Sequence, residues 1–231
     1  VPEPERFISS FPEYVADVVV YRDGDYAVAI DRRGNTIARS TNHAEVIRKT
    51  IEQTPIGGKV VIVGDFVVAS QIDVLKPLRI VGLGINRTKI VLADGADSHI
   101  FMVKADGVEM RNMTIDGNRD KQTAQKSGII VLGSYCKFER LKIVNVGYTG
   151  IDIHRDENAG YDAHDNLIRD VIVDGFGNVG IYIGSGAYRN TVENVVVRNG
   201  GKYGSAPDGD GIFLDSLTSA NPSGLIGYEN R

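Results

Sequence analysis

Short apolar segments, each closed by a turn that contains Gly or Asn, follow one another along the chain from Lys59 to Asp215. Segments of this kind are typical of β-strands. They fall into two families that alternate along the sequence. The first family includes "NMTI", "RLKI", "DVIV" and "NVVV", and the second comprises "GIIVLG", "GIDIH", "GIYIG" and "GIFLD". No helical periodicity separates them, so the pattern predicts an all-β domain.

The leading glycines of the second family are Gly128, Gly150, Gly180 and Gly211, which are separated by 22, 30 and 31 residues. A strand set that recurs at such intervals favours a parallel β-helix, in which each coil buries its apolar face only by stacking on the next. A propeller blade needs about 40 residues or more. A Rossmann sheet needs helices between its strands. An ordinary β-sandwich is the remaining alternative.

The sequence before Lys59 predicts three further parts. Residues 1–14 contain three prolines and no periodicity, which is typical of an arm or linker. Residues 15–41 alternate apolar and polar side chains around two turns, which predicts a small antiparallel β-meander. Residues 42–54 have helical periodicity, and a helix here can cover the open strand edge. The β-helix, with this N-terminal capping helix, is expected to span residues 42–231.

Composition and charge narrow the class of protein. The formal net charge of −4 does not suggest a nucleic-acid partner. No apolar run approaches about 18 residues, so no transmembrane helix or membrane partner is predicted. The 27 glycines fit many short strands joined by turns. The single cysteine, Cys136, excludes an internal disulfide framework.

Strand alternation places particular side chains on the outer surface. In "GIDIH", Ile151 and Ile153 face the core, while Asp152 and His154 face outward. Aligning the coils by their glycines gives two outward columns. The first column contains Ile130, Asp152, Tyr182 and Phe213, and the second contains Leu132, His154, Gly184 and Asp215. Because coils lie about 4.8 Å apart, an acid, an imidazole and two aromatic rings share one surface.

This combination is typical of a sugar-binding groove, because aromatic rings offer flat apolar area beside polar groups. We therefore predict four residues that contact a saccharide: Tyr182, Phe213, Asp215 and Arg155. The alternative interpretation is that Asp152 and His154 are only the solvated side of a strand, because outward residues are usually polar for that reason.

The charged segment after His154 has a simpler interpretation. Residues 155–166, "RDENAGYDAHDN", join two strands, and charged residues are common in such turns without any chemistry. Carboxylates and loop carbonyls also form Ca²⁺ sites, so calcium is a candidate cofactor, although no EF-hand spacing is present. His43, near the start of the helix, and His99, before a strand, are expected to have structural roles.

Three segments, "GLGINRTKIVLADGAD", "MRNMTIDGNRD" and "GIDIH", resemble one known family. Together they look like the catalytic module of secreted mannuronan C5-epimerases, within the pectate-lyase-like superfamily. The resemblance runs from about His43 to Phe213, and the helix followed by "GGKVVIVGDFVV" is similar to the N-terminal cap and first coil of this superfamily. It implies a right-handed parallel β-helix and an extracellular or cell-surface location.

The resemblance also implies a reaction. The family removes the C5 proton of a uronate in an alginate-like polymer and returns a proton to the opposite face, whereas related lyases expel the 4-O glycosidic bond. Its Asp-Pro-His motif matches Asp152-Ile153-His154, and its groove lysine matches Lys126. By this resemblance His154 would be a general base or acid and Asp152 would hold the substrate carboxylate or orient His154. Lys126 would bind negative charge.

The chain departs from the family pattern at several positions. The family has a Tyr one residue before the strand glycine, where this chain has Thr149, and Tyr148 would have to substitute from the neighbouring position. The family has an acidic residue just after the groove lysine, where this chain has Ser127 or Gly128. It has a second acidic residue at the end of the next strand, where this chain has Gly184. These departures bear on the activity more than on the fold.

Three functional classes therefore compete. The first is a polyuronate epimerase or lyase, and the second is a non-catalytic carbohydrate-binding or structural β-helix of a cell surface or viral fibre. The third is a glycoside hydrolase, which needs two carboxylates about 5–9.5 Å apart; Asp152 and Asp215 lie two coils apart, roughly 10 Å or more. The repeats are still regular near Asp215, so an uncovered coil there would favour self-association through that end.

Overall fold

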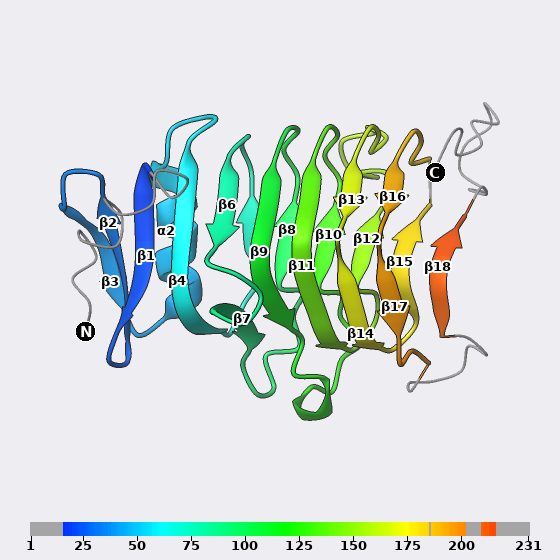
Figure 1. Ribbon diagram of the computed structural model, residues 1–231, viewed down its shortest axis with the longest axis horizontal. Helices are drawn as coiled ribbons and strands as arrows, with labels where there is room; N and C mark the ends of the chain where they lie inside the picture. Colours follow the sequence, from blue (N-terminus) through cyan, green and yellow to red (C-terminus); the bar gives the residue numbers. More distant parts are fainter. Residues whose placement is uncertain (1–15, 185, 202–208, 216–231) are drawn as a thin grey trace.

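Alternating apolar residues build two sheets that enclose one continuous apolar core, and the coils that carry them stack side by side in Figure 1. The computed structural model describes residues 16–184, 186–201 and 209–215. The predicted arm, residues 1–14, lies outside the described residues.

The first sheet has twelve strands, and its main path runs β16-β13-β11-β9-β6-β4-β1-β2-β3. Its strands are β1 (Val18–Asp23), β2 (Tyr26–Asp31), β3 (Thr36–Ser40), β4 (Lys59–Val68), β6 (Arg79–Gly82), β7 (Thr88–Leu92), β9 (Glu109–Asp116), β11 (Lys137–Val146), β13 (Leu167–Arg169), β14 (Ile172–Phe176), β16 (Thr191–Glu193) and β17 (Val196–Arg198). A short 3₁₀ helix, η2 (Arg119–Lys121), follows β9.

The second sheet has six strands in the order β18-β15-β12-β10-β8-β5. They are β5 (Ile72–Val74), β8 (Phe101–Val103), β10 (Ile129–Val131), β12 (Ile151–Ile153), β15 (Val179–Ile183) and β18 (Asp210–Leu214). All neighbours in this sheet pair in parallel, and the register aligns Ile130, Asp152, Tyr182 and Phe213. The predicted parallel β-helix and the first outward column are therefore confirmed.

Three of the four repeated glycines stand where adjacent coils approach too closely for a side chain. A Cβ atom on Gly128 would lie 2.9 Å from the carbonyl oxygen of Gly150, and one on Gly150 would lie 2.5 Å from that of Gly180. On Gly180 it would lie 2.5 Å from the carbonyl oxygen of Gly211. The glycine spacing in the sequence thus reflects the steric packing of one coil on the next.

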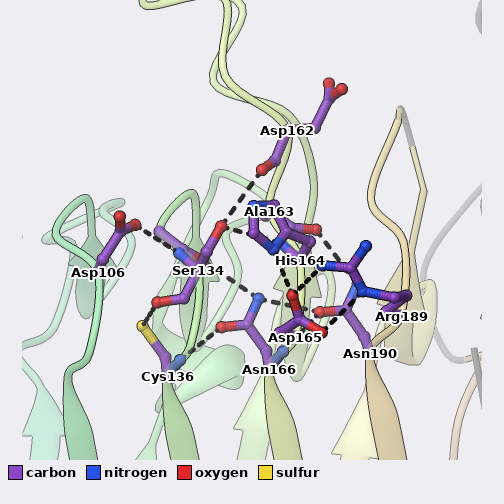
Figure 2. A network of polar contacts seen from close by, with 11 residues as sticks. Asp106, Ser134, Cys136, Asp162, Ala163, His164, Asp165, Asn166, Arg189 and Asn190 are labelled. Carbon is purple, nitrogen blue, oxygen red and sulfur yellow. Dashed lines mark hydrogen bonds and ion pairs between the residues drawn. The ribbon is translucent and has the colours of Figure 1, made fainter.

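Buried asparagines join the turns of consecutive coils, as Figure 2 shows. The Oδ1 atom of Asn166 accepts a hydrogen bond from the backbone N–H of Cys136 at 2.8 Å. The Oδ1 atom of Asn190 accepts one from the backbone N–H of Asn166 at 3.0 Å. Asn166 also donates from Nδ2 to the carbonyl oxygen of Gly133 at 3.1 Å. These side chains satisfy backbone groups that would otherwise be buried without partners.

The N-terminal meander is continuous with the first sheet. Strands β1, β2 and β3 pair antiparallel, and β1 also pairs in parallel with β4 of the first coil. The helix α2 (His43–Gln53) follows, and the side chain of Asn42 caps it by accepting a hydrogen bond from the Glu45 N–H at 3.2 Å. Its apolar residues Val46, Ile47 and Ile51 are buried in the main core, so α2 covers this end of the β-helix.

We expect Gly150→Ala to destabilise the protein by roughly 1–3 kcal/mol, because the added Cβ would overpack the contact with Gly180 and would lie 2.6 Å from Cγ1 of Val173. Gly211→Ala is the matched control in the same column, because its nearest contact would be 3.8 Å from Val197. Urea denaturation of both variants measures the difference. Equal stability of the two variants would contradict the steric explanation.

Candidate active site

The second sheet carries a groove beside β12. It has a volume of about 340 Å³, and its walls come from Met102 and Ile130 on the strands, from Lys104, Leu132 and His154 just after strands, and from the turn that begins at Arg155. His154 is partly exposed there, with 29 % of its side chain accessible. The groove thus presents an imidazole beside an apolar floor, which is typical of a small polar ligand site.

Asp152 points outward from β12 but is nearly buried, with 8 % of the residue exposed. Its neighbours in the first column are Ile130 and Tyr182, which pair with it on either side. Its Oδ1 atom is buried and accepts no hydrogen bond from the described residues. This burial is not what a merely solvated strand face shows, because an unpaired buried carboxylate is costly.

Burial also raises the pKa of the Asp152 carboxyl group, and the charge of His154 opposes that effect. The Nε2 atom of His154 lies 4.0 Å from Oδ1 of Asp152. The two groups are therefore close enough for the charge on one to alter the protonation of the other. Such coupled and desolvated pairs are common at functional sites.

The hydrogen bond to His154 determines which of its nitrogens can act as a base. The Nδ1 atom lies 2.7 Å from the carbonyl oxygen of Arg155. A carbonyl oxygen can only accept a hydrogen bond, so Nδ1 must carry the proton. In the neutral imidazole, the lone pair is then on Nε2, the atom closer to Asp152. His154 is therefore oriented as a general base.

Lys126 lies on the turn that precedes β10, and His99 lies on the equivalent turn before β8. The Nδ1 atom of His99 accepts a hydrogen bond from the backbone N–H of Ser127 at 3.0 Å. Burial and then the charge of Lys126 lower the pKa of His99 to about 4, with a smaller effect from His154. His99 is therefore neutral near pH 7 and carries its proton on Nε2, where it can donate a hydrogen bond.

From the sequence we expected a structural role for His99. Its hydrogen bond with the Ser127 backbone fits that role, and the charge of Lys126 also acts on its ring. One signal for this was present in the sequence. His99 stands two residues before Phe101, as Ser127 stands two residues before Ile129, and these two strand residues are paired. His43 differs, because both of its ring nitrogens form hydrogen bonds with the backbone. Its Nδ1 atom accepts one from the N–H of Val67, and its Nε2 atom donates one to the carbonyl oxygen of Asp25.

Tyr148 and Thr149 occupy the turn before β12. Thr149 is only 2 % exposed, so its side chain is not on the surface. Tyr148 is 39 % exposed, and its backbone N–H donates a hydrogen bond to the carbonyl oxygen of Lys126 at 3.0 Å. The structure thus places Tyr148, and not Thr149, as the exposed residue next to Lys126.

The aromatic residues of the first column lie together on the outer surface. The rings of Tyr182 and Phe213 stack with centroids 5.9 Å apart. The hydroxyl of Tyr182 donates a hydrogen bond to Oδ2 of Asp215 at 2.9 Å. A Cβ atom on Gly184 would lie 2.3 Å from the Tyr182 hydroxyl oxygen, so the absence of a side chain at Gly184 makes room for this ring. These predicted saccharide contacts form one aromatic and acidic surface.

Arg155 and the turn after it form a compact wall beside the groove. The guanidinium of Arg155 contacts Oδ1 of Asp162 at 3.1 Å and the carbonyl oxygen of Gly160 at 3.2 Å. The Oδ1 atom of Asp156 accepts hydrogen bonds from the N–H groups of Asn158 and Ala159, both at 3.0 Å. Much of the charge in this turn therefore holds the turn itself together.

Among the described residues, no group of three or more His, Cys, Asp or Glu side chains is arranged to hold a metal ion. No helix in the described parts of the chain is both long and apolar enough to cross a bilayer.

A second cavity, of about 700 Å³, lies on the first sheet, away from His154. Its walls include charged residues that pair with one another or with close neighbours. Lys89 lies 2.5 Å from Asp116, and Asp174 lies 2.8 Å from Arg198. Because the two charges in each of these pairs neutralise each other, this cavity is a weaker candidate for a catalytic site than the groove at His154.

Comparison with protein families defines the class to which this fold belongs. A family model described as "Right handed beta helix region" matches residues 98–222, which is more than half of the chain. The chain therefore belongs to this family of right-handed β-helix proteins. A comparison with curated proteins found no match.

Solved structures support the same fold. The chain is similar to the A-modules of two mannuronan C-5 epimerases from Azotobacter vinelandii, AlgE4 and AlgE6, with TM-scores of 0.52 and 0.53 and 17 % identity to each. The matches cover 75 % of this chain and 60 % and 59 % of those modules. It is also similar to ORF18 of Geobacillus virus E2, with a TM-score of 0.52 and 15 % identity over 82 % of this chain and 43 % of that one.

We predict that the stability of the protein falls as the pH is lowered from 6.5 towards 4, in part because of His99. The unfolded chain binds a proton at His99 near pH 6.5, whereas the folded protein does so only near pH 4. Between these values the unfolded state binds more protons, so unfolding becomes easier as the pH falls. Urea denaturation at pH 6.5 and 4.5 should show a smaller loss for His99→Gln, by roughly 1–2 kcal/mol. An identical loss in both proteins would contradict the assigned protonation.

Proposed function

We propose that the protein acts on a polyuronate by removing the C5 proton, as an epimerase or a lyase. The observation that carries this proposal is the pair of Asp152, a buried carboxyl group without a hydrogen bond at Oδ1, and His154, whose Nε2 lies 4.0 Å away. The similarity in fold to mannuronan C-5 epimerase modules gives further support.

His154 is the proposed base. With its proton on Nδ1, which the Arg155 carbonyl requires, its Nε2 atom can take the C5 proton of a uronate. The C5–H electron pair moves into the adjacent carboxylate, which becomes an enolate. His154 is then an imidazolium ion, because its Nε2 atom has gained the C5 proton.

Three groups are proposed to hold the carboxylate of the substrate. Lys126 supplies a positive charge, and the raised pKa of Asp152 favours a protonated carboxyl that can donate a hydrogen bond to the developing enolate. His99 can donate from Nε2 without adding charge. Electrostatic stabilisation of this kind matters most where water is excluded, as it is around Asp152.

The second half of the reaction distinguishes an epimerase from a lyase. In an epimerase, the enolate electron pair takes a proton on the opposite face of the sugar, and Tyr148 is the proposed donor because it is exposed beside Lys126. In a lyase, the same electron pair forms a C4–C5 double bond and expels the 4-O glycosidic oxygen, which leaves with a proton. Both routes begin with the same base.

Incubation with polymannuronate, with and without calcium, tests this proposal directly. New guluronate proton signals in the NMR spectrum indicate epimerisation, and rising ultraviolet absorbance from an unsaturated uronate indicates lysis. We expect His154→Ala and Asp152→Asn each to lower the rate by roughly 10²–10⁴-fold, because each removes a group that moves or stabilises a proton.

Asp73→Asn is the matched control for Asp152→Asn. Asp73 stands in the same outward column, paired with Met102, which in turn pairs with Ile130 beside Asp152. Asp73 is not one of the residues that line the groove, although its ion-pair partner Lys104 is, so this variant should keep the full rate. The proposal fails if no polyuronate reacts, or if the Asp73 and Asp152 variants lose activity equally.

A second candidate function is a non-catalytic carbohydrate-binding or structural β-helix, of the kind found in cell-surface or viral assemblies. The similarity in fold to a viral protein favours it, and so do the exposed apolar residues near the last described coil. These residues are Val196, Ile212, Phe213 and Leu214. This candidate includes self-association through that surface. Binding of a polysaccharide with no turnover would support it over the enzyme.

Both candidate functions imply an extracellular or cell-surface location, because polyuronates and fibre partners are found outside the cell. We infer it only as part of the proposed function. Secretion of the full-length protein from its own cells, followed by activity in the medium, would test it separately from the reaction.

A further inference from the structure

On the far side of the turn that begins at Arg155, the described residues form a separate cavity of about 590 Å³. Its walls include His164, Tyr161 and Tyr188, which the proposed reaction does not use. The turn from Asp156 to Asp162 stands between this cavity and the groove at His154, since residues of that turn line both. The cavity is therefore a second place where a ligand can bind.

His164 is held in one orientation by charged and aromatic neighbours, and Figure 2 shows the charged ones, Asp165 and Arg189. Its Nδ1 atom lies 2.7 Å from Oδ2 of Asp165, and the guanidinium of Arg189 binds both oxygens of that carboxylate. The ring stacks on Tyr188, with centroids 4.8 Å apart, and meets Tyr135 edge-on at 5.1 Å. This arrangement is fixed before any ligand arrives, which lowers the entropic cost of binding.

The contact with Asp165 determines which nitrogen of His164 is available. Hydrogen bonds from Arg189 lower the pKa of Asp165 to about 2, so this carboxylate is ionised and accepts the proton carried on Nδ1 of His164. In the neutral ring, Nε2 then holds a lone pair and can accept a hydrogen bond from a hydroxyl group. No described residue forms a hydrogen bond with that atom.

Three carboxylates line the same cavity, and each has one oxygen fixed by the protein. Asp106 accepts a hydrogen bond from the backbone N–H of Ser134 at 2.7 Å. Asp156 accepts two backbone N–H groups of its own turn, and Asp162 accepts the guanidinium of Arg155. The second oxygen of each carboxylate is thereby oriented and can accept a further hydrogen bond. Lys104 also lines the cavity, but the three carboxylates outnumber it, so a ligand with several hydroxyl groups matches this set better than an anion does.

Tyr161 adds the remaining feature that a sugar requires. It lines the cavity and is 73 % exposed, so its ring offers a flat apolar face to the solvent. Sugar rings stack their apolar C–H faces on such surfaces while their hydroxyl groups reach polar neighbours. We propose that this cavity binds a neutral hexose unit, stacked on Tyr161 and hydrogen-bonded to Nε2 of His164.

Methyl glucoside and methyl glucuronide form a matched pair of probes, since they differ by one carboxylate. Each is titrated at pH 7 into the full-length protein while the four imidazole signals are followed by proton–carbon NMR, with His164 assigned from His164→Gln. We expect the glucoside to shift the His164 signal saturably in the millimolar range and to leave His154 unchanged. The glucuronide should bind more weakly, because the three carboxylates of the cavity outnumber its one cation, Lys104.

Variants at Tyr161 test the stacking contact without disturbing the core. Tyr161→Ala should weaken glucoside binding roughly three- to tenfold, and Tyr161→Phe should keep it. Tyr26→Ala is the control, because Tyr26 is also exposed but lies on β2, in the N-terminal meander. Asp152→Asn should keep the binding as well, so failure of the proposed reaction would leave this result intact.

Three outcomes would overturn the proposal. The first is a His164 signal that neither glycoside shifts. The second is glucuronide binding as tight as that of the glucoside, and the third is unchanged glucoside binding in Tyr161→Ala.

Discussion

Parallel hydrogen bonding between coils in one fixed register is the constraint on which the rest of this molecule depends. The register continues from Asp73 in β5 to Phe213 in β18 without a slip in the outward column. Glycines at Gly128, Gly150 and Gly180 permit it, because a Cβ at any of them would meet the backbone of the next coil. A one-residue slip would turn every inward side chain outward, so the apolar core and the surface columns are specified together.

The same register explains why Asp152 is buried although it faces outward. On a flat polar strand an aspartate would be solvated, but its cross-strand neighbours here are Ile130, which is itself nearly buried, and the large ring of Tyr182. That ring extends over Gly184, where any side chain would collide with it. The raised pKa of Asp152 is therefore a property of the column and not of its immediate sequence.

The sequence predicted the strands, the capping helix and the alignment of the outward columns, because each depends on local alternation and on the glycine spacing. It did not predict the burial of Asp152 or the position of His99 near Lys126. Those features depend on how the turns between the strands fold, and the turns differ from coil to coil, because the repeated glycines are spaced 22, 30 and 31 residues apart. Arg155 illustrates the difficulty, since its guanidinium binds Asp162, which lies seven positions later in the turn that follows it.

The turns also decide what the histidines of this protein can do. The Nδ1 atom of His154 faces a backbone carbonyl and must carry a proton, whereas the Nδ1 atom of His99 faces a backbone N–H and cannot. The first ring is left with a basic Nε2 and the second with an Nε2–H donor, although both imidazoles stand next to strands of the same sheet, His154 directly after β12 and His99 two residues before β8. The parallel strands supply a rigid framework of fixed spacing, and the backbone of each turn then assigns a different chemical role to the same side chain.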